Sequence, residues 1–192
     1  MSGAAGSDGE TPAGADGSAP RAPDGWAPAE AVPDVWVVSA GEVRTARLLV
    51  AAQFVLLGLI AVLPGGWGWP VPAWLRWSAL AGVVAGLVVM LLAGTALGRG
   101  LTAVPIPNRH AVLRTGGLYR VVRHPIYTGL LLAAGSWTVG SGSGWRALAF
   151  VALVVLLSVK ARWEEERLAR RFAAYPDYAS RTPRFVPGWR VR

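Results

Sequence analysis

The sequence contains no cysteine and only two histidines, His110 and His124. The absence of thiols excludes disulfide bridges, thiolate nucleophiles and cysteine-ligated metals. Two histidines are too few for a histidine-rich metal site, so we predict no metal centre. No G-x-G-x-x-G fingerprint follows a strand-like run, and neither a Walker A motif nor a G-x-S-x-G elbow is present. A nucleotide-type cofactor would therefore need a different architecture.

Charged side chains are also scarce, at 16% of the residues, whereas 53% are hydrophobic. Five Arg lie in 99–123, and nine Lys or Arg lie in 160–192. Basic segments between long uncharged runs are typical of integral membrane proteins, whereas a DNA-binding module carries its basic face on a water-soluble fold. We therefore predict an all-α integral membrane protein that binds no nucleic acid, despite a net charge of +8. Four stretches contain no Asp, Glu, Lys or Arg: 48–75, 77–98, 124–145 and 147–159.

These stretches predict about four transmembrane helices. Pro64-Gly65-Gly66 ends the first one, and Gly82 and Gly86 in the second would let another helix approach closely. The last two apolar runs, 125–140 and 145–159, have only about 15 residues each. A helix needs ~20 residues to span a bilayer without help from its flanks. The turn Ser141-Gly142-Ser143-Gly144 joins them into a tight antiparallel helical hairpin. The expected spans are roughly 48–63, 74–98, 125–140 and 145–159.

The N-terminal tail differs from the rest of the chain. Residues 1–42 are rich in Gly, Ala, Pro, Ser and Asp, with seven acidic residues against one Arg. This composition buries too little apolar surface to fold, so we interpret it as a disordered tail, followed by N-terminal transmembrane helices in 43–98. Because 99–123 and the C-terminal segment are Arg-rich, we expect both termini to be cytoplasmic. The Ala/Gly/Arg-rich composition favours a bacterial inner (plasma) membrane.

The first candidate site is Arg123-His124-Pro125-x-Tyr127. Proline suits the first turn of a helix, where its missing N–H costs nothing, so Arg123 and His124 would lie at a helix N-terminus. An Arg that reaches the membrane surface and an interfacial Tyr anchor would explain part of this pattern without any function. A histidine directly before this Pro has no such structural explanation, and polar groups at this depth favour a functional interpretation.

The second candidate site is Arg162 with Glu164-Glu165, at the far end of the hairpin. These charges are also compatible with a solvated helix face, since Glu164 to Glu166 run around a helix. The hairpin would place the start of the third apolar run beside the end of the fourth. His124 and Tyr127 would then lie near Arg162, Glu164 and Glu165 at one membrane level.

Several ordered motifs resemble the isoprenylcysteine carboxyl methyltransferase and phospholipid methyltransferase superfamily over about residues 97–187. The chain departs from the family pattern after Phe172, where Ala173 replaces a usual Gly, so the register of Tyr175 and Tyr178 is not fixed by the resemblance. The motifs are Leu97-Gly98-Arg99, Pro105-Ile106-Pro107, Gly116-Gly117-x-Tyr119-Arg120, Arg123-His124-Pro125-x-Tyr127-x-Gly129, Glu164-Glu165-x-x-Leu168 and Arg184-Phe185-x-Pro187.

The resemblance implies an S-adenosylmethionine-dependent membrane methyltransferase, with 99–192 as its catalytic region and a cofactor pocket on the cytoplasmic side. Arg162 and Glu164 would lie near the acceptor and the site of methyl transfer. The cofactor would be bound by Gly117, Tyr119, Arg123, His124, Pro125, Tyr127 and Glu165.

The resemblance leaves the acceptor open: it would be lipophilic, with an isoprenoid or prenylcysteine carboxylate or a lipid amine as the reacting group. A carboxylate would be held by Arg123 or Arg162, whereas an amine would need a general base such as Glu164. Two alternatives remain. One is an NADPH-dependent membrane reductase of the steroid-reductase-like type, and the other is a membrane protein without catalytic activity.

Overall fold

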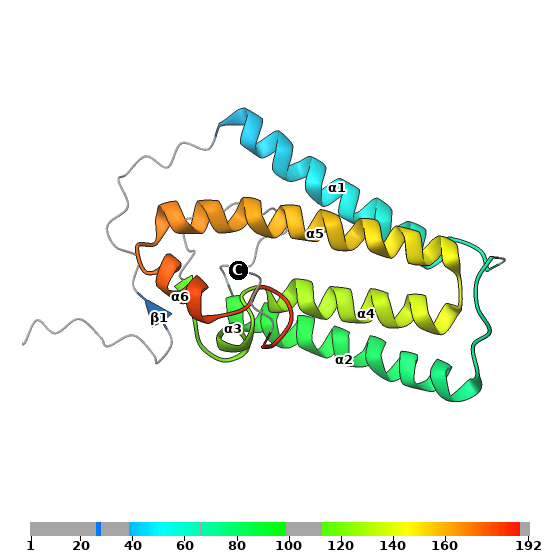
Figure 1. The fold of residues 1–192 in the computed structure, drawn as a ribbon. Coiled ribbons are helices and arrows are strands. Elements are labelled where there is room, and N and C mark those ends of the chain that lie inside the picture. Colours follow the sequence, from blue (N-terminus) through cyan, green and yellow to red (C-terminus); the bar gives the residue numbers. More distant parts are fainter. Residues whose placement is uncertain (1–25, 28–38, 66, 99–112, 189–192) are drawn as a thin grey trace, which may run out of the picture.

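The computed structural model describes residues 26–27, 39–65, 67–98 and 113–188, and these form an almost entirely helical fold (Figure 1). This confirms the all-α prediction. The elements, in chain order, are β1 (Trp26–Ala27), α1 (Ala40–Val62), α2 (Ala73–Leu97), β2 (Leu113–Arg114), α3 (Leu118–Val121), α4 (Pro125–Ser141), α5 (Gly144–Arg171) and α6 (Tyr175–Arg181).

Three of the described helices, α1, α2 and α5, are long and apolar enough to cross a membrane. Only 11% of the apolar window of α1 and of α2 is buried inside the protein. Large apolar side chains such as Phe54, Val84 and Val151 therefore face outward, as lipid-facing helices require. Helix α4 has 17 residues, or roughly 26 Å at 1.5 Å per residue. The number of four spans stays a prediction.

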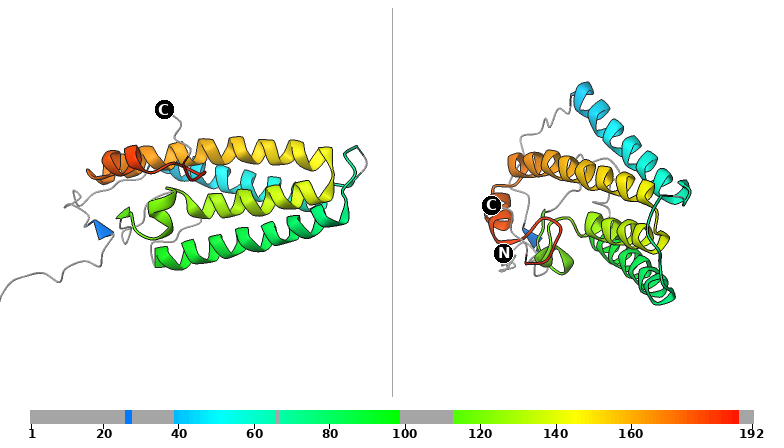
Figure 2. Two further views of the ribbon diagram at one scale, coloured as in Figure 1. Left: turned by 60° about the horizontal axis from the view of Figure 1, so that its bottom comes forward. Right: turned by 45° about the vertical axis from the view of Figure 1, so that its right-hand side comes forward.

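The helices α1, α5, α4 and α2 lie next to one another in that order, and Figure 1 and the right-hand view of Figure 2 show α5 between α1 and α4. Leu153 and Leu157 of α5 are fully buried against Ile60 of α1 and Ala134 of α4. The apolar run that starts near Trp145 and the basic segment after it form one helix of 28 residues. Helix α5 therefore carries core residues at one end and charged residues at the other.

Helices α2 and α4 approach closely because glycines face each other. A Cβ atom on Gly86 would lie 2.5 Å from the carbonyl oxygen of Gly129, and a Cβ on Gly129 would lie 2.6 Å from that of Gly86. Farther along, a Cβ on Gly82 would collide with Ser136. The expectation that Gly82 and Gly86 admit a neighbouring helix is met.

The predicted hairpin is present, with α4 ending at Ser141 and α5 starting at Gly144. Ser143 caps α5, and its hydroxyl donates to the carbonyl of Pro64 at 2.9 Å. Arg146 Nε donates to the carbonyl of Leu63 at 2.8 Å, and its guanidinium lies 5.6 Å from the ring centroid of Trp137. The turn is thus tied to the C-terminal end of α1.

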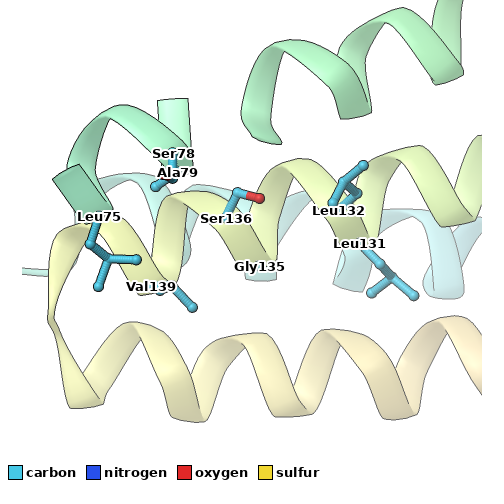
Figure 3. A pocket seen from close by; sticks show the side chains of 8 residues that line it. All are labelled: Leu75, Ser78, Ala79, Leu131, Leu132, Gly135, Ser136 and Val139. Carbon is cyan, nitrogen blue, oxygen red and sulfur yellow. The ribbon is translucent and has the colours of Figure 1, made fainter. Parts of the chain in front are cut away.

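A cavity of about 380 Å³ lies between α2 and α4, toward the hairpin turn (Figure 3). It has no titratable side chain and lies toward the opposite end of α4 from His124 and Tyr127, so it is not the candidate catalytic site. Its lining residues are Leu75, Ser78, Ala79, Leu131, Leu132, Gly135, Ser136 and Val139.

The tail predicted as disordered, 1–42, lies largely outside the described residues, and the whole of 99–112 does, including His110 and the motif residues Arg99 and Pro105-Ile106-Pro107. Where the tail is described, Trp26–Ala27 pairs antiparallel with Leu113–Arg114. Ser39 and Glu42 form a capping box, with the Ser39 hydroxyl accepting from Glu42 N and the Glu42 carboxylate from Ser39 N. Helix α1 consequently begins three residues before the expected boundary at 43. The Ser-x-x-Glu spacing is the signal for this start.

Candidate functional site

The start of α4 positions the first motif. His124 is the N-cap residue and Pro125 is the first helical residue, as the sequence predicts. The His124 side chain is 93% buried, with 7% exposure, and Pro125 is fully buried. The histidine ring stacks on Tyr127 with centroids 5.3 Å apart and planes 4° from parallel.

The C-terminal segment after α6 runs alongside this helix start. Main-chain N–H groups of Arg123 and His124 donate to the carbonyls of Pro183 and Arg184 at 2.9 and 3.1 Å. The hydroxyl of Thr128 donates to the carbonyl of Phe185 at 2.8 Å. We call residues 183–185 the C-terminal strap. It satisfies N–H groups at the N-terminus of α4 that have no partner inside the helix.

Glu165 of α5 is the most heavily bonded side chain of the site. Its carboxylate accepts from Arg123 Nε at 3.1 Å, contacts His124 Nε2 at 3.0 Å, and accepts from Arg184 Nε at 2.9 Å. The hydrogen bond to Glu165 raises the pKa of Arg184, so this guanidinium stays charged. The Glu165 side chain is only 13% exposed, and its one carboxylate is shared by the guanidinium groups of Arg123 and Arg184.

Glu164 contacts the other side of the same histidine. Its carboxylate accepts a hydrogen bond from the Tyr127 hydroxyl at 3.0 Å and lies 3.8 Å from His124 Nδ1. His124 therefore bridges two neighbouring carboxylates, one through each ring nitrogen. We call Arg123, His124, Tyr127, Glu164, Glu165 and Arg184 the His124 cluster.

Three buried tyrosines surround the cluster. The Tyr119 hydroxyl donates to the carbonyl of Ala93 in α2 at 3.4 Å, and the Tyr178 hydroxyl donates to the carbonyl of Tyr119. The Tyr175 hydroxyl is buried and has no hydrogen-bond partner among the described residues. Burial raises the pKa of all three phenols, so they are neutral at physiological pH.

The hairpin brings together five of the predicted site residues, namely Arg123, His124, Tyr127, Glu164 and Glu165. Two others lie apart. Arg162 is exposed, and within the described ranges it makes no ion pair with the cluster. Gly117 is exposed at the N-cap of α3, where its φ of 60° favours glycine. The catalytic and cofactor-binding roles given to these residues stay predictions.

Sequence reasoning did not assign three residues to this site: Lys160, Gln53 and Arg184, the last of which it named only as part of the Arg184-Phe185-x-Pro187 motif. Lys160 Nζ donates to Gln53 Oε1 at 2.7 Å and lies 5.1 Å from the ring centroid of Tyr127. Gln53 is the sole polar side chain within the first apolar run, 48–63. An amide in that setting needs a partner, and this requirement was the available signal.

Comparison with known proteins identifies a family. The sequence model of the phospholipid methyltransferase family matches residues 74–175, just over half of the chain. That range includes α4 and the carboxylates of α5, but not Gln53 or Arg184.

Three curated relatives are similar to parts of the chain. Protein-S-isoprenylcysteine O-methyltransferase B of Arabidopsis thaliana is 28% identical over an alignment of 179 positions, and the match covers 83% of this chain and 86% of that protein. Methanethiol S-methyltransferase 2 of Bradyrhizobium diazoefficiens is 37% identical over 75 residues, 38% of this chain and 28% of that protein. The nickel-cobalt-cadmium resistance protein NccN of Alcaligenes xylosoxydans xylosoxydans is 29% identical over 131 residues, 67% of this chain and 59% of that protein.

The family match spans most of α2, the whole of α4 and α5 and the two motifs that meet at His124. Two of the three relatives are named as methyltransferases. Together with three helices able to cross a membrane, these findings agree with the resemblance drawn from the motifs. The chain belongs to the phospholipid methyltransferase family and is an integral membrane methyltransferase.

Proposed function

We propose that the protein transfers a methyl group from S-adenosylmethionine to a lipophilic acceptor at the membrane surface. The observation that supports this most directly is the contact of His124 with both Glu164 and Glu165. It joins the two ordered motifs of the family in one sheltered cluster. The acceptor would carry an isoprenoid or prenylcysteine carboxylate, or a lipid amine.

The residues of the cluster fit the polar groups of this cofactor. S-adenosylmethionine has a carboxylate, an ammonium and ribose hydroxyls, and these need cationic, anionic and hydrogen-bonding partners respectively. Arg123 and Arg184 exceed the charge of Glu165 and suit a carboxylate. Glu164 has oxygen lone pairs to spare for an ammonium or a hydroxyl. The buried hydroxyl of Tyr175, unpaired among the described residues, could donate to either. When bound, the cofactor supplies an electrophilic methyl group on a sulfonium.

The chain's own groups would mainly position the reactants and exclude water. The burial of His124 keeps this part of the site dry, which strengthens the hydrogen bonds around it. Tyr127 holds Glu164 by its hydroxyl, so this carboxylate is oriented before any acceptor arrives. With an amine acceptor, Glu164 would take the proton that the nitrogen loses. With a carboxylate acceptor no proton is lost, and the exposed Arg162 would hold the second oxygen.

The proposal includes a location and a division of the chain. All members of the His124 cluster lie at the α4 start and α5 end of the bundle, the side on which α3 and α6 also lie (Figure 1). We assign this side to the cytoplasm of a bacterium, with both termini there and the inner membrane as the location. Residues 99–192 would be the catalytic region.

The deciding experiment measures cofactor binding and methyl transfer by the detergent-purified protein. S-adenosylmethionine is expected to bind, and its labelled methyl group to reach at least one of two probes: S-farnesylcysteine or phosphatidylethanolamine. His124→Ala and Glu165→Ala should abolish binding, whereas Glu166→Ala, an exposed neighbour, should not. Binding of NADPH in place of S-adenosylmethionine would favour a reductase, and binding of neither would overturn the proposal.

A further inference from the structure

Lys160 lies where a lysine is costly. It belongs to α5, one helical turn before Glu164, and only 3% of its surface is exposed. Lysines in membrane helices usually extend toward the water so that the ammonium leaves the apolar region. Here the ammonium remains inside the bundle, where it donates to Gln53 Oε1 of α1 at 2.7 Å.

No ion pair offsets this burial. Within the described part of the chain, no carboxylate oxygen lies within 4.0 Å of Lys160 Nζ. A buried charge with a neutral partner is a poor tether, because an apolar side chain of similar volume would pack α1 against α5 with no desolvation penalty. The position of Lys160 is therefore better explained by what the ammonium does to its other neighbour.

That neighbour is Tyr127. The ammonium lies 5.1 Å from the centroid of its ring, at cation–π distance, while His124 stacks on the same ring. The Tyr127 hydroxyl donates to Glu164 at 3.0 Å. A cation against the ring draws electron density from the phenol and makes its O–H a better donor, because hydrogen-bonded groups polarise one another at low dielectric.

Lys160 and Glu164 also lie four residues apart on one helix, and so face the same side of α5. The ammonium thus acts on the Tyr127–Glu164 pair from two directions. Its cation–π contact fixes the ring, and its place on the same helix face puts it beside the carboxylate that the Tyr127 hydroxyl binds.

We propose that Lys160, held in place by Gln53, is a positioning residue that fixes Tyr127 and, through it, the carboxylate of Glu164. Its effect on turnover rests on the proposed function, whereas its effect on the Tyr127 ring does not. The inference extends the site to α1, because Gln53 lies outside the family match of 74–175.

The chain contains a matched control at the other end of α5. Arg146 also lies over an aromatic ring of α4, that of Trp137, and donates to the carbonyl of Leu63, the residue directly after α1. It differs in that it is only partly buried, donates to main-chain oxygens, and has no partner in the His124 cluster among the described residues. If Lys160 and Arg146 did no more than hold the helices together, replacing either residue should change the rate to the same extent.

The kinetic test compares Lys160→Met, Lys160→Arg and Arg146→Met in the full-length purified protein, with S-adenosylmethionine and the best acceptor probe. In Lys160→Met we expect kcat to fall by about tenfold, the scale of a small misplacement of reacting groups, with KM changing by less than about twofold. Lys160→Arg should recover most of the rate, and Arg146→Met should keep it. Wild-type kcat in Lys160→Met, or equal losses in Lys160→Met and Arg146→Met, would refute the inference.

A second readout needs no cofactor and no acceptor. The chain has four tyrosines, so 3-fluorotyrosine labelling gives four fluorine NMR signals, and Tyr127→Phe identifies one of them. In Lys160→Met the Tyr127 signal should broaden or split as the ring loses its fixed position, and in Lys160→Arg it should sharpen again. Arg146→Met should leave it narrow. A single narrow Tyr127 signal in Lys160→Met would overturn the inference even in a protein that transfers methyl groups. The expected broadening in a protein without transferase activity would support it while refuting the proposed function.

Discussion

The two ends of the α4–α5 hairpin are built from similar parts but bonded differently. At the turn, polar side chains bind main-chain carbonyls of α1 and the residues that follow it. Ser143 donates to Pro64, Arg146 to Leu63, and Trp137 to Ile60. A main-chain carbonyl cannot ionise or change partner by rotating, so this end is fixed.

At the opposite end, which we call the open end, α4 begins and α5 finishes. There, side chains bind other side chains. Glu165 meets two guanidinium groups and an imidazole, and Glu164 meets a phenol and the same imidazole. Such partners can be exchanged for groups of a ligand without unfolding a helix. The turn end therefore holds the bundle closed, whereas the side-chain bonds of the open end are ones for which a ligand can compete. Three substitutions separate the two ends, and a fourth, Gly86→Ala, tests the helix contact between α2 and α4.

The largest effect is expected for Glu165→Gln. Removal of the charge leaves Arg123 and Arg184 without their common counter-ion, and breaking a buried ion pair from one side costs on the order of 3 kcal/mol. We expect a lower midpoint of thermal unfolding and the loss of S-adenosylmethionine binding, both measured on purified protein. Glu166→Gln, one residue farther along α5 and exposed, should change neither. Equal behaviour of the two variants would mean that the open end has no special role.

Gly86→Ala tests the contact between α2 and α4. The new methyl group would lie 2.5 Å from a main-chain oxygen of α4, so the helices must separate, at about 1–3 kcal/mol. The matched control is Gly58→Ala in α1, where no atom beyond the local helix backbone lies within 4 Å of the new methyl group. There alanine should stabilise the helix by roughly 0.5–1 kcal/mol. Chemical denaturation in detergent would measure the change in the free energy of unfolding for both variants. A gain in stability in Gly86→Ala, as in Gly58→Ala, would contradict the close contact.

Ser143→Ala examines the closed end alone. It removes the cap of α5 and the bond to the Pro64 carbonyl, at about 1 kcal/mol of stability. Since Ser143 lies at the far end of the hairpin from His124, binding of S-adenosylmethionine and the rate of transfer should match the wild type. A calorimetric scan and an activity assay on the same sample would check this. A loss of binding without a loss of stability would erase the distinction between the ends.

Tyr175→Phe should have the smallest effect on stability. Its hydroxyl has no partner among the described residues, so removing it should change the free energy of unfolding by less than about 0.5 kcal/mol. If the hydroxyl is reserved for the cofactor, binding of S-adenosylmethionine should weaken by roughly fivefold to tenfold, the value of one hydrogen bond. Isothermal titration would measure this, and unchanged affinity would remove Tyr175 from the site.

The sequence predicted those parts of the fold that depend on local pattern. Uncharged runs located the helices, the Ser141–Gly144 turn located the hairpin, and the hairpin brought His124 beside Glu164 and Glu165. These steps need only helix geometry and short connections. The start of α1 was missed, although its capping box is also a local signal.

The parts that could not be predicted depend on packing between distant segments. Nothing in the spacing says that Arg184 returns to Glu165, or that Gln53 meets Lys160, because neither pair lies on one helix face. Arg162 was predicted beside the carboxylates because it is close in sequence. In α5 its side chain is exposed, whereas Glu164 and Glu165 are partly buried, so closeness in sequence does not decide which side chains join the cluster. Its role is decided by the acceptor, whose identity no pattern in the chain encodes.

The C-terminal strap has a consequence for how the protein is made. Its carbonyls are synthesised after all of the described apolar helices, at about 5–20 residues per second. Membrane insertion and completion of the site are therefore separate events in time. A nascent chain that ends at Thr182 should already be inserted, with the amides of Arg123 and His124 still lacking their acceptors. Faster hydrogen exchange at these two amides in such a truncated chain would reveal the interval, and wild-type protection would show that the helix start forms unaided.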